Sequence, residues 1–191
     1  MGKDIKGDLI GIFVHIAVKN SFVGALSVVT LDGDPEEFIY MEPVTITSLQ
    51  RALLAGRVDA YMIAKVLVRP LIEKAKKPPS IICFEGSWLL QRTLDFTVPH
   101  VVMAEVGSKY KSSYWEEFTL DSNGGEILNC WAPHEAVPHV KPILEAAQKA
   151  MAPIDIRDLF RQVREALTEI KKENPSIYSE FETLQKKDMK K

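Results

Sequence analysis

The amino-acid sequence predicts an α/β fold in which helices cover a mixed sheet. Two apolar, β-branched runs over 9–18 and 22–31 predict an antiparallel hairpin. Apolar residues at three-and-four spacing after residue 47 predict a long helix. Two later runs, over 80–84 and 98–106, are short and unbroken, which is typical of strands that are buried on both faces of a parallel sheet.

The first strands are expected to form an antiparallel meander. Polar turns over 19–21 and 32–35 separate them. Residues 36–41 alternate in polarity, which predicts a third, partly exposed strand. Pro43 should end the meander, because proline has no amide hydrogen to donate to a sheet.

The helix after the meander begins with a capping signal. Thr47 and Gln50 have the spacing of a capping box, in which each side chain accepts a backbone N–H at the helix start. The apolar residues of the helix are Leu49, Leu53, Leu54, Val58, Met62, Val66 and Leu67. Gly56 and Pro70 are expected to interrupt it, because glycine weakens a helix interior and proline removes a hydrogen bond.

The middle of the chain predicts a strand, a crossover and a second strand. The segment between the runs over 80–84 and 98–106 is long enough for a short helix, and a crossover of this kind makes the two strands parallel. A long surface loop is expected over 107–124, followed by a last strand over 126–131.

Two helices are predicted near the carboxyl end, over 140–150 and 154–172. Asp155 is placed to cap the second of them. This helix carries an apolar stripe that consists of Ile156, Leu159, Phe160, Val163, Leu167 and Ile170. Either the sheet of the same chain or a second copy must cover the stripe, so a homo-oligomer through 154–172 is one expectation.

Size and composition fit one globular domain. With 191 residues, we expect a single α/β domain over 1–173 and a charged, mobile tail over 174–191. Apolar residues make up 46% of the chain and charged residues 26%, a balance that excludes a disordered chain. A net charge of −2 supplies no global attraction to nucleic acid or to a membrane. Without a signal sequence or an apolar span, and with only two cysteines, the expectation is a cytoplasmic protein with no membrane partner.

The order of these elements resembles that of ribonuclease-H-like domains, and of the endonuclease V type in particular. The resemblance covers about residues 9–106 and lies in the element order. That family is known for a metal-binding aspartate in the first strand, where this chain reads IFVHIAV with His15 near the relevant place. The family is acidic and glycine-rich after the later buried strand, where this chain has Glu85 and Gly86. The resemblance implies a metal-dependent nuclease.

Two carboxylates are candidate catalytic residues. Glu85 and Glu105 lie near the carboxyl ends of the predicted parallel strands, where open α/β sheets place their ligands. They could hold a divalent cation, magnesium or manganese, with Glu42 or Asp95 supplying further oxygen ligands. The alternative is that these glutamates are strand-end residues that form turns or surface ion pairs.

A second candidate site lies around Cys130. Cys130, His134 and His139 have the spacing C-x3-H-x4-H, and all three residue types bind zinc, with Glu135 as a further ligand or base. Two alternatives stay open at this point. The set could be a buried cysteine with two loop histidines, or Cys130 could be a nucleophile with His134 as its base.

Isolated histidines and one aromatic segment are weaker candidates. His15 and His100 each lie in an apolar strand, as a core residue with one hydrogen-bond partner or as a residue facing a crevice. Basic and aromatic residues, the combination found in single-strand binders, alternate at Lys109, Tyr110, Lys111, Tyr114 and Trp115. The glutamates that follow reverse the local charge and favour a solvated loop.

No phosphate-loop, dinucleotide-binding or hydrolase motif occurs in the sequence. We therefore first interpret the chain as a non-catalytic binding or interaction domain. The alternative is an atypical metal-dependent nuclease or nucleic-acid-processing enzyme, which would use magnesium or manganese.

Overall fold

A computed structural model describes residues 7–18, 20–91, 93, 96–104 and 111–173. The strands are β1 (Ile10–Val18), β2 (Ser21–Val29), β3 (Pro35–Tyr40), β4 (Val44–Thr45), β5 (Ile81–Glu85), β6 (His100–Met103), β7 (Trp115–Asp121) and β8 (Ile127–Pro133). The α-helices are α1 (Ser48–Leu54), α2 (Val58–Tyr61), α3 (Arg69–Lys74), α4 (Val137–Ala150) and α5 (Ile156–Glu173). Between them lie the 3₁₀ turns η2 (Ala55–Arg57) and η4 (Ser87–Gln91) and the π-helix η3 (Met62–Val68).

The strands in this part of the chain form one mixed sheet. Their order is β3-β2-β1-β5-β6-β8-β7, and β4 pairs with β2. The strands β1, β5 and β6 are parallel, with Ile12 beside Cys83 and Glu85 beside Met103. Antiparallel strands flank this centre on both sides. The predicted mixed sheet, its leading hairpin and its parallel pair are therefore confirmed.

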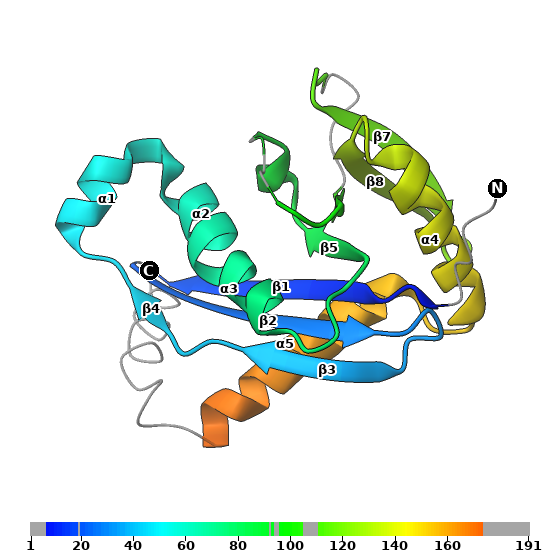
Figure 1. Ribbon diagram of the computed structural model, residues 1–191, viewed down its shortest axis with the longest axis horizontal. Helices are drawn as coiled ribbons and strands as arrows, with labels where there is room; N and C mark the ends of the chain where they lie inside the picture. Colours follow the sequence, from blue (N-terminus) through cyan, green and yellow to red (C-terminus); the bar gives the residue numbers. More distant parts are fainter. Residues whose placement is uncertain (1–6, 19, 92, 94–95, 105–110, 174–191) are drawn as a thin grey trace.

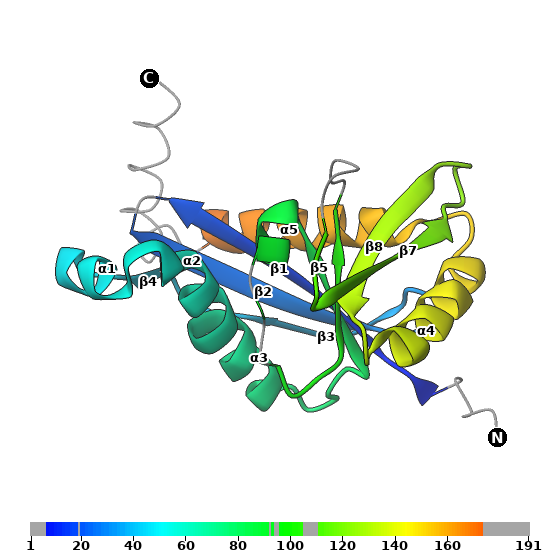
Figure 2. The same ribbon diagram turned by 90° about the horizontal axis from the view of Figure 1, so that it is seen from above.

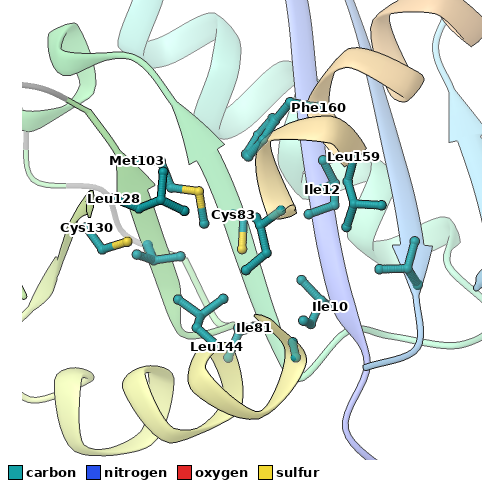
Figure 3. Packing of buried hydrophobic residues seen from close by; sticks show 14 of the residues in the cluster. Ile10, Ile12, Ile81, Cys83, Met103, Leu128, Cys130, Leu144, Leu159 and Phe160 are labelled. Atoms are coloured by element: carbon teal, nitrogen blue, oxygen red, sulfur yellow. The ribbon is translucent and has the colours of Figure 1, made fainter. Parts of the chain in front are cut away.

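Strict alternation along the central strands gives the sheet two apolar faces. Ile10 and Ile12 of β1 point to the face covered by α4 and α5, together with Ile81 and Cys83 of β5 (Figure 3). Intervening residues such as Phe13 point to the other face, where residues of α2, η3 and α3 cover them. Figures 1 and 2 show α5 on one face of the sheet and α1 to α3 on the opposite face. Both faces of the parallel centre are thus withdrawn from water.

The long helical segment starts as predicted. Thr47 Oγ1 accepts the Gln50 N–H at 3.2 Å and Gln50 Oε1 accepts the Thr47 N–H at 2.8 Å, which is the expected capping box. The interruption near Gly56 is also present, as the 3₁₀ turn η2. Pro70 does not end the helical segment, because the π-helix η3 runs directly into α3, whose first turn contains Pro70.

The start of this segment differs from the prediction in its packing. The side chains of Leu49 and Leu53 are 70% and 71% exposed, although their spacing predicts a buried face. Helix α1 projects away from the sheet (Figure 1), and of its leucines only Leu54 packs against the core, where it is partly buried. The buried part of the predicted face begins at Val58.

Two further strands occur where none is expected. After Pro43, β4 pairs with the first residues of β2. Within the segment 107–124, predicted as a surface loop, β7 pairs along its whole length with β8. Trp115, Phe118 and Leu120 of β7 are buried while the intervening charged residues are exposed. The polar composition of this segment therefore reflects one solvent-facing side of an edge strand.

The helix at the carboxyl end is capped and packed within the chain. Asp155 Oδ1 accepts the Arg157 N–H at 2.9 Å, which confirms the predicted cap. Ile156, Leu159, Phe160, Val163 and Leu167 are buried, and the helix contacts β1 and β2. Because the sheet of the same chain covers the stripe, the expectation of a homo-oligomer through 154–172 loses its basis. The tail predicted over 174–191 lies outside the described residues.

Within the described ranges, no helix is long and apolar enough to cross a membrane.

The packing of α5 predicts the effect of a charge in its stripe. Val163→Asp should lower the free energy of unfolding by at least ~3 kcal/mol, because it buries a carboxylate without a partner. Urea denaturation followed by circular dichroism measures the change. Gln162→Asp, at the neighbouring exposed position, is the matched control and should change stability little. A fully stable Val163→Asp variant would contradict this packing of the helix.

Candidate functional site

A crevice opens at the carboxyl ends of β5 and β6. Its volume is about 710 Å³. The residues that line it are Glu85, Gly86, Ser87, Met103, Ala104, Glu126, Ile127, Leu128, Asn129, Arg157 and Phe160. They come from the ends of β5 and β6, the start of β8 and the first turns of α5. Ligands of open α/β sheets usually bind at this edge, so the crevice is the candidate functional site.

Glu85 is one of two acidic residues that line this crevice, the other being Glu126. Glu85 is the last residue of β5, and Gly86 after it turns the chain with a φ of 114°, a conformation that favours glycine. The guanidinium of Arg164 from α5 forms an ion pair with the Glu85 carboxylate. The two side chains are 43% and 46% exposed, so water screens their attraction and the pair adds little to stability.

A second arginine of α5 lies in the crevice wall. Arg157 Nη1 donates to Glu126 Oε2 at 2.6 Å, and Arg157 Nε donates to Asp155 Oδ1 at 3.3 Å. These hydrogen bonds raise the pKa of Arg157 above its usual value. Arg157 and Arg164 are seven residues apart, about 10.5 Å along the helix axis, so they lie on the same side of α5.

His15 occupies the later part of β1, where the family resemblance implies an aspartate. Its ring stacks on Phe13, with 6.0 Å between centroids and 12° between planes. Burial lowers the pKa of His15 to about 4, although the carboxylate of Asp59 raises it, and the positive charge of Arg164 lowers it further. His15 is therefore neutral at physiological pH.

The described residues do not form a metal site. No three histidine, cysteine, aspartate or glutamate side chains gather within that part of the chain. Glu85 is engaged by Arg164, and Glu42 follows β3, an edge strand on the far side of β1 from β6. The other predicted ligands, Glu105 and Asp95, lie outside the described residues. A magnesium or manganese ion does not fit the described side chains by themselves.

The second predicted site is not assembled. Cys130 is buried in the core among residues of the sheet and α4 (Figure 3), and burial raises its pKa to about 12, which is opposite to the need of a nucleophile. His134 is exposed, with its Nδ1 2.9 Å from Glu116 Oε2. His139 lies in the first turn of α4, and no metal-binding group forms there among the described residues. Both the zinc and the nucleophile hypotheses are corrected by this separation.

The aromatic segment does not form a stacking surface for bases. Lys109 and Tyr110 lie outside the described residues, while Lys111 is exposed. Trp115 is buried, and it meets the ring of His100 edge-on at a centroid distance of 5.5 Å. The indole is therefore part of the core, and the hypothesis that Trp115 stacks on a nucleic-acid base is wrong.

His100 is a core residue beneath this segment. Its ring meets the rings of Phe84, Phe96 and Trp115 nearly at right angles. Desolvation lowers the pKa of His100 to about 4, against a smaller opposing effect from its hydrogen bond with the Val98 backbone. Its Nε2 atom has no hydrogen-bond partner within the described structure. A proton on this ring would have to be accommodated among aromatic carbons.

The sequence predicts Glu85 as a candidate site residue, but it does not predict the two arginines of α5, Arg157 and Arg164. Their charge predicts only that Arg157 and Arg164 lie on the solvated side of the helix over 154–172. Their spacing with Phe160, three and then four residues, places all of them along one flank of α5. Glu126 and Asn129 had no signal, because the strand β8 that carries them reaches the crevice only through its pairing with β6 and β7.

No family model matches the chain, and no curated protein matches its sequence. The solved structures that are similar to it include two of endonuclease V. The crystal structure of endonuclease V from Ciona intestinalis, in complex with a 24mer DNA containing an inosine followed by a ribo-adenosine, has 12% identity and a TM-score of 0.50. The likeness covers 85% of this chain and 87% of that chain. The crystal structure of endonuclease V from Bacillus subtilis has 11% identity and a TM-score of 0.51, over 87% of this chain and 82% of that chain.

These likenesses show that the chain has an endonuclease V-like fold, as its element order predicts. They contradict the first interpretation of the chain as a non-catalytic binding or interaction domain, because both of these similar structures are endonucleases. The correction favours the alternative interpretation.

The lowered pKa values of His15, which is half-buried, and His100, which is buried, predict a loss of stability in acid. His15 and His100 have folded-state pKa values of about 4 and ordinary values near 6.5 when unfolded. Their contribution to the free energy of unfolding is complete above about pH 6.5. It is lost as the pH falls towards 4, because the histidines of the unfolded state bind protons at a higher pH than those of the folded state. Each histidine should add a slope of up to about 1.4 kcal/mol per pH unit.

Urea denaturation at pH 7, 6 and 5 measures this slope. His100→Phe should reduce it, since phenylalanine keeps an aromatic ring in the core and cannot be protonated. An equal slope in the variant would show that His100 does not resist protonation in the folded protein.

Proposed function

We propose that the chain is a nucleic-acid-processing enzyme of ribonuclease-H-like fold that cleaves DNA phosphodiester bonds in the crevice at the ends of β5 and β6. The observation that carries this proposal is the position of Glu85 at the carboxyl end of a central parallel strand, with Arg164 paired to it and Arg157 in the wall of the same crevice. The likeness to endonuclease V supports it, because in one solved structure that fold is bound to DNA.

The side chains present suit a phosphate substrate. Arginine guanidinium groups donate parallel hydrogen bonds to phosphate oxygens. Arg157 lines the crevice, Arg164 pairs with Glu85 of its lining, and both arginines are partly exposed. Glu85, once released from Arg164, can accept the proton of an attacking water. The water oxygen then forms its bond to phosphorus as the bond to the leaving oxygen breaks, and the leaving oxygen takes up a proton from solvent.

A divalent ion, magnesium or manganese, is the cofactor that this fold implies. The described residues do not form a site for this ion, so no part of the reaction above depends on it. In this proposal a metal would require Glu105 beside Glu85, since each follows one of two adjacent parallel strands. The net charge of −2 means that DNA binding would rest on the arginines of the crevice rather than on a global field.

A cytoplasmic location is part of the same proposal. Cys83 and Cys130 are both free and both buried in the core, which is the state that a reducing compartment maintains.

Cleavage of labelled oligonucleotides tests the proposed function. Single-stranded and duplex DNA, with and without inosine, are incubated with magnesium, manganese or EDTA. We expect strand cleavage in at least one metal-containing reaction, and a rate at least about 100-fold lower for Glu85→Gln, which is the usual cost of removing a general base.

Glu165→Gln is the matched control, because it removes the same charge from an exposed ion pair on α5. Its rate should equal that of the wild type. The proposal is wrong if no DNA is cleaved, or if Glu85→Gln cleaves as fast as the control.

A further inference from the structure

We infer that Arg164 is the phosphate-binding residue of the crevice, and that Glu85 occupies the place of the phosphate until a phosphodiester displaces it. This inference rests on the proposed function for the identity of the ligand. The role of the Arg164–Glu85 ion pair in this inference follows neither from the sequence nor from the fold by itself.

The first argument is the exchangeability of the pair. A carboxylate and a phosphate offer the guanidinium group the same arrangement of acceptor oxygens, so one can replace the other on Arg164. Both side chains are more than 40% exposed, and an exposed ion pair is worth at most about 1 kcal/mol. Breaking the Arg164–Glu85 ion pair therefore costs a binding phosphodiester little free energy.

The second argument is that neighbouring arginines are held differently. Arg161 pairs with Asp158 and Glu165, which lie on its own helix and move with it. Arg157 is bound by the carboxylates of Glu126 and Asp155, and Asp155 is buried and fixed as the helix cap. Arg164 pairs with Glu85 at the end of β5, so its partner is neither on its own helix nor the fixed helix cap.

The third argument is the position of the Arg164 charge. Arg164 is close enough to β1 to lower the pKa of His15, and it contacts the end of β5 directly. Its guanidinium thus lies where the carboxyl halves of two central parallel strands meet α5. An anion bound there would face Glu85, which by then has a free carboxylate.

Phosphate binding and release of Glu85 are therefore one event. A ligand that binds only when Arg164 is free must, by reciprocity, favour the state in which Glu85 is free. The protein would in this way keep its proton acceptor neutralised by Arg164 until substrate arrives.

Fluorescence anisotropy with a labelled single-stranded DNA oligonucleotide in EDTA tests the exchange without metal and without cleavage. Glu85→Gln should tighten binding up to about fivefold, because the competing carboxylate is gone. Arg164→Gln should weaken binding about tenfold or more and reduce the slope of log K against log salt by about 0.7. The double variant should bind like Arg164→Gln alone, since Glu85 competes only through Arg164.

Glu165→Gln controls for the general effect of removing one negative charge from this side of the protein. The inference is overturned if Glu85→Gln binds no tighter than Glu165→Gln, if the double variant binds tighter than Arg164→Gln, or if neither wild type nor Glu85→Gln binds DNA at low salt. Cleavage by the wild type together with any of these results would leave the proposed function standing. Tighter binding by Glu85→Gln without cleavage by any variant would support the exchange and contradict the enzyme.

Discussion

Burial of both faces of the parallel centre is the constraint on which the rest of this structure depends. A sheet that is covered on both faces needs apolar side chains at every position, and β5 and β6 meet this demand with consecutive buried residues. Alternation then divides the interior into two separate cores, one beneath α4 and α5 and the other beneath α2, η3 and α3. Each helix is held in place by the core that it covers.

The same burial creates the site. Because the parallel strands run in one direction, their carboxyl ends come together at one edge, and Glu85 is the first charged residue of β5 to reach water there. The apolar stripe that packs α5 on β1 and β2 also determines which way the side of the helix with Arg157 and Arg164 faces. Arg157 and Arg164 are carried to the crevice by the apolar residues between them, of which Phe160 is itself part of the crevice wall.

Charge is distributed unevenly between the interior and this edge. His15 and His100 are neutral, because desolvation lowers the pKa of each to about 4, and the thiol of Cys83 is likewise held in its neutral form by burial, which raises its pKa. The ion pairs, in contrast, lie in partly exposed positions, where they can be exchanged. The interior therefore supplies rigidity, and the crevice supplies charges that a ligand can rearrange.

The sequence by itself determined the leading hairpin, the two buried strands that it predicts over 80–84 and 98–106, the capped helix starts at Thr47 and Asp155, and the candidate Glu85. These features follow from neighbours in sequence, because hydrogen bonds of caps and the alternation of a strand are local. Only the tertiary structure decided that α1 lacks a surface to bury Leu49, that β7 is a strand, that Cys130 and His134 are apart, and that Arg164 meets Glu85. Each of these depends on which surface lies opposite a residue. Such a surface is formed by segments that are distant in the chain, and they leave no pattern in the sequence near that residue.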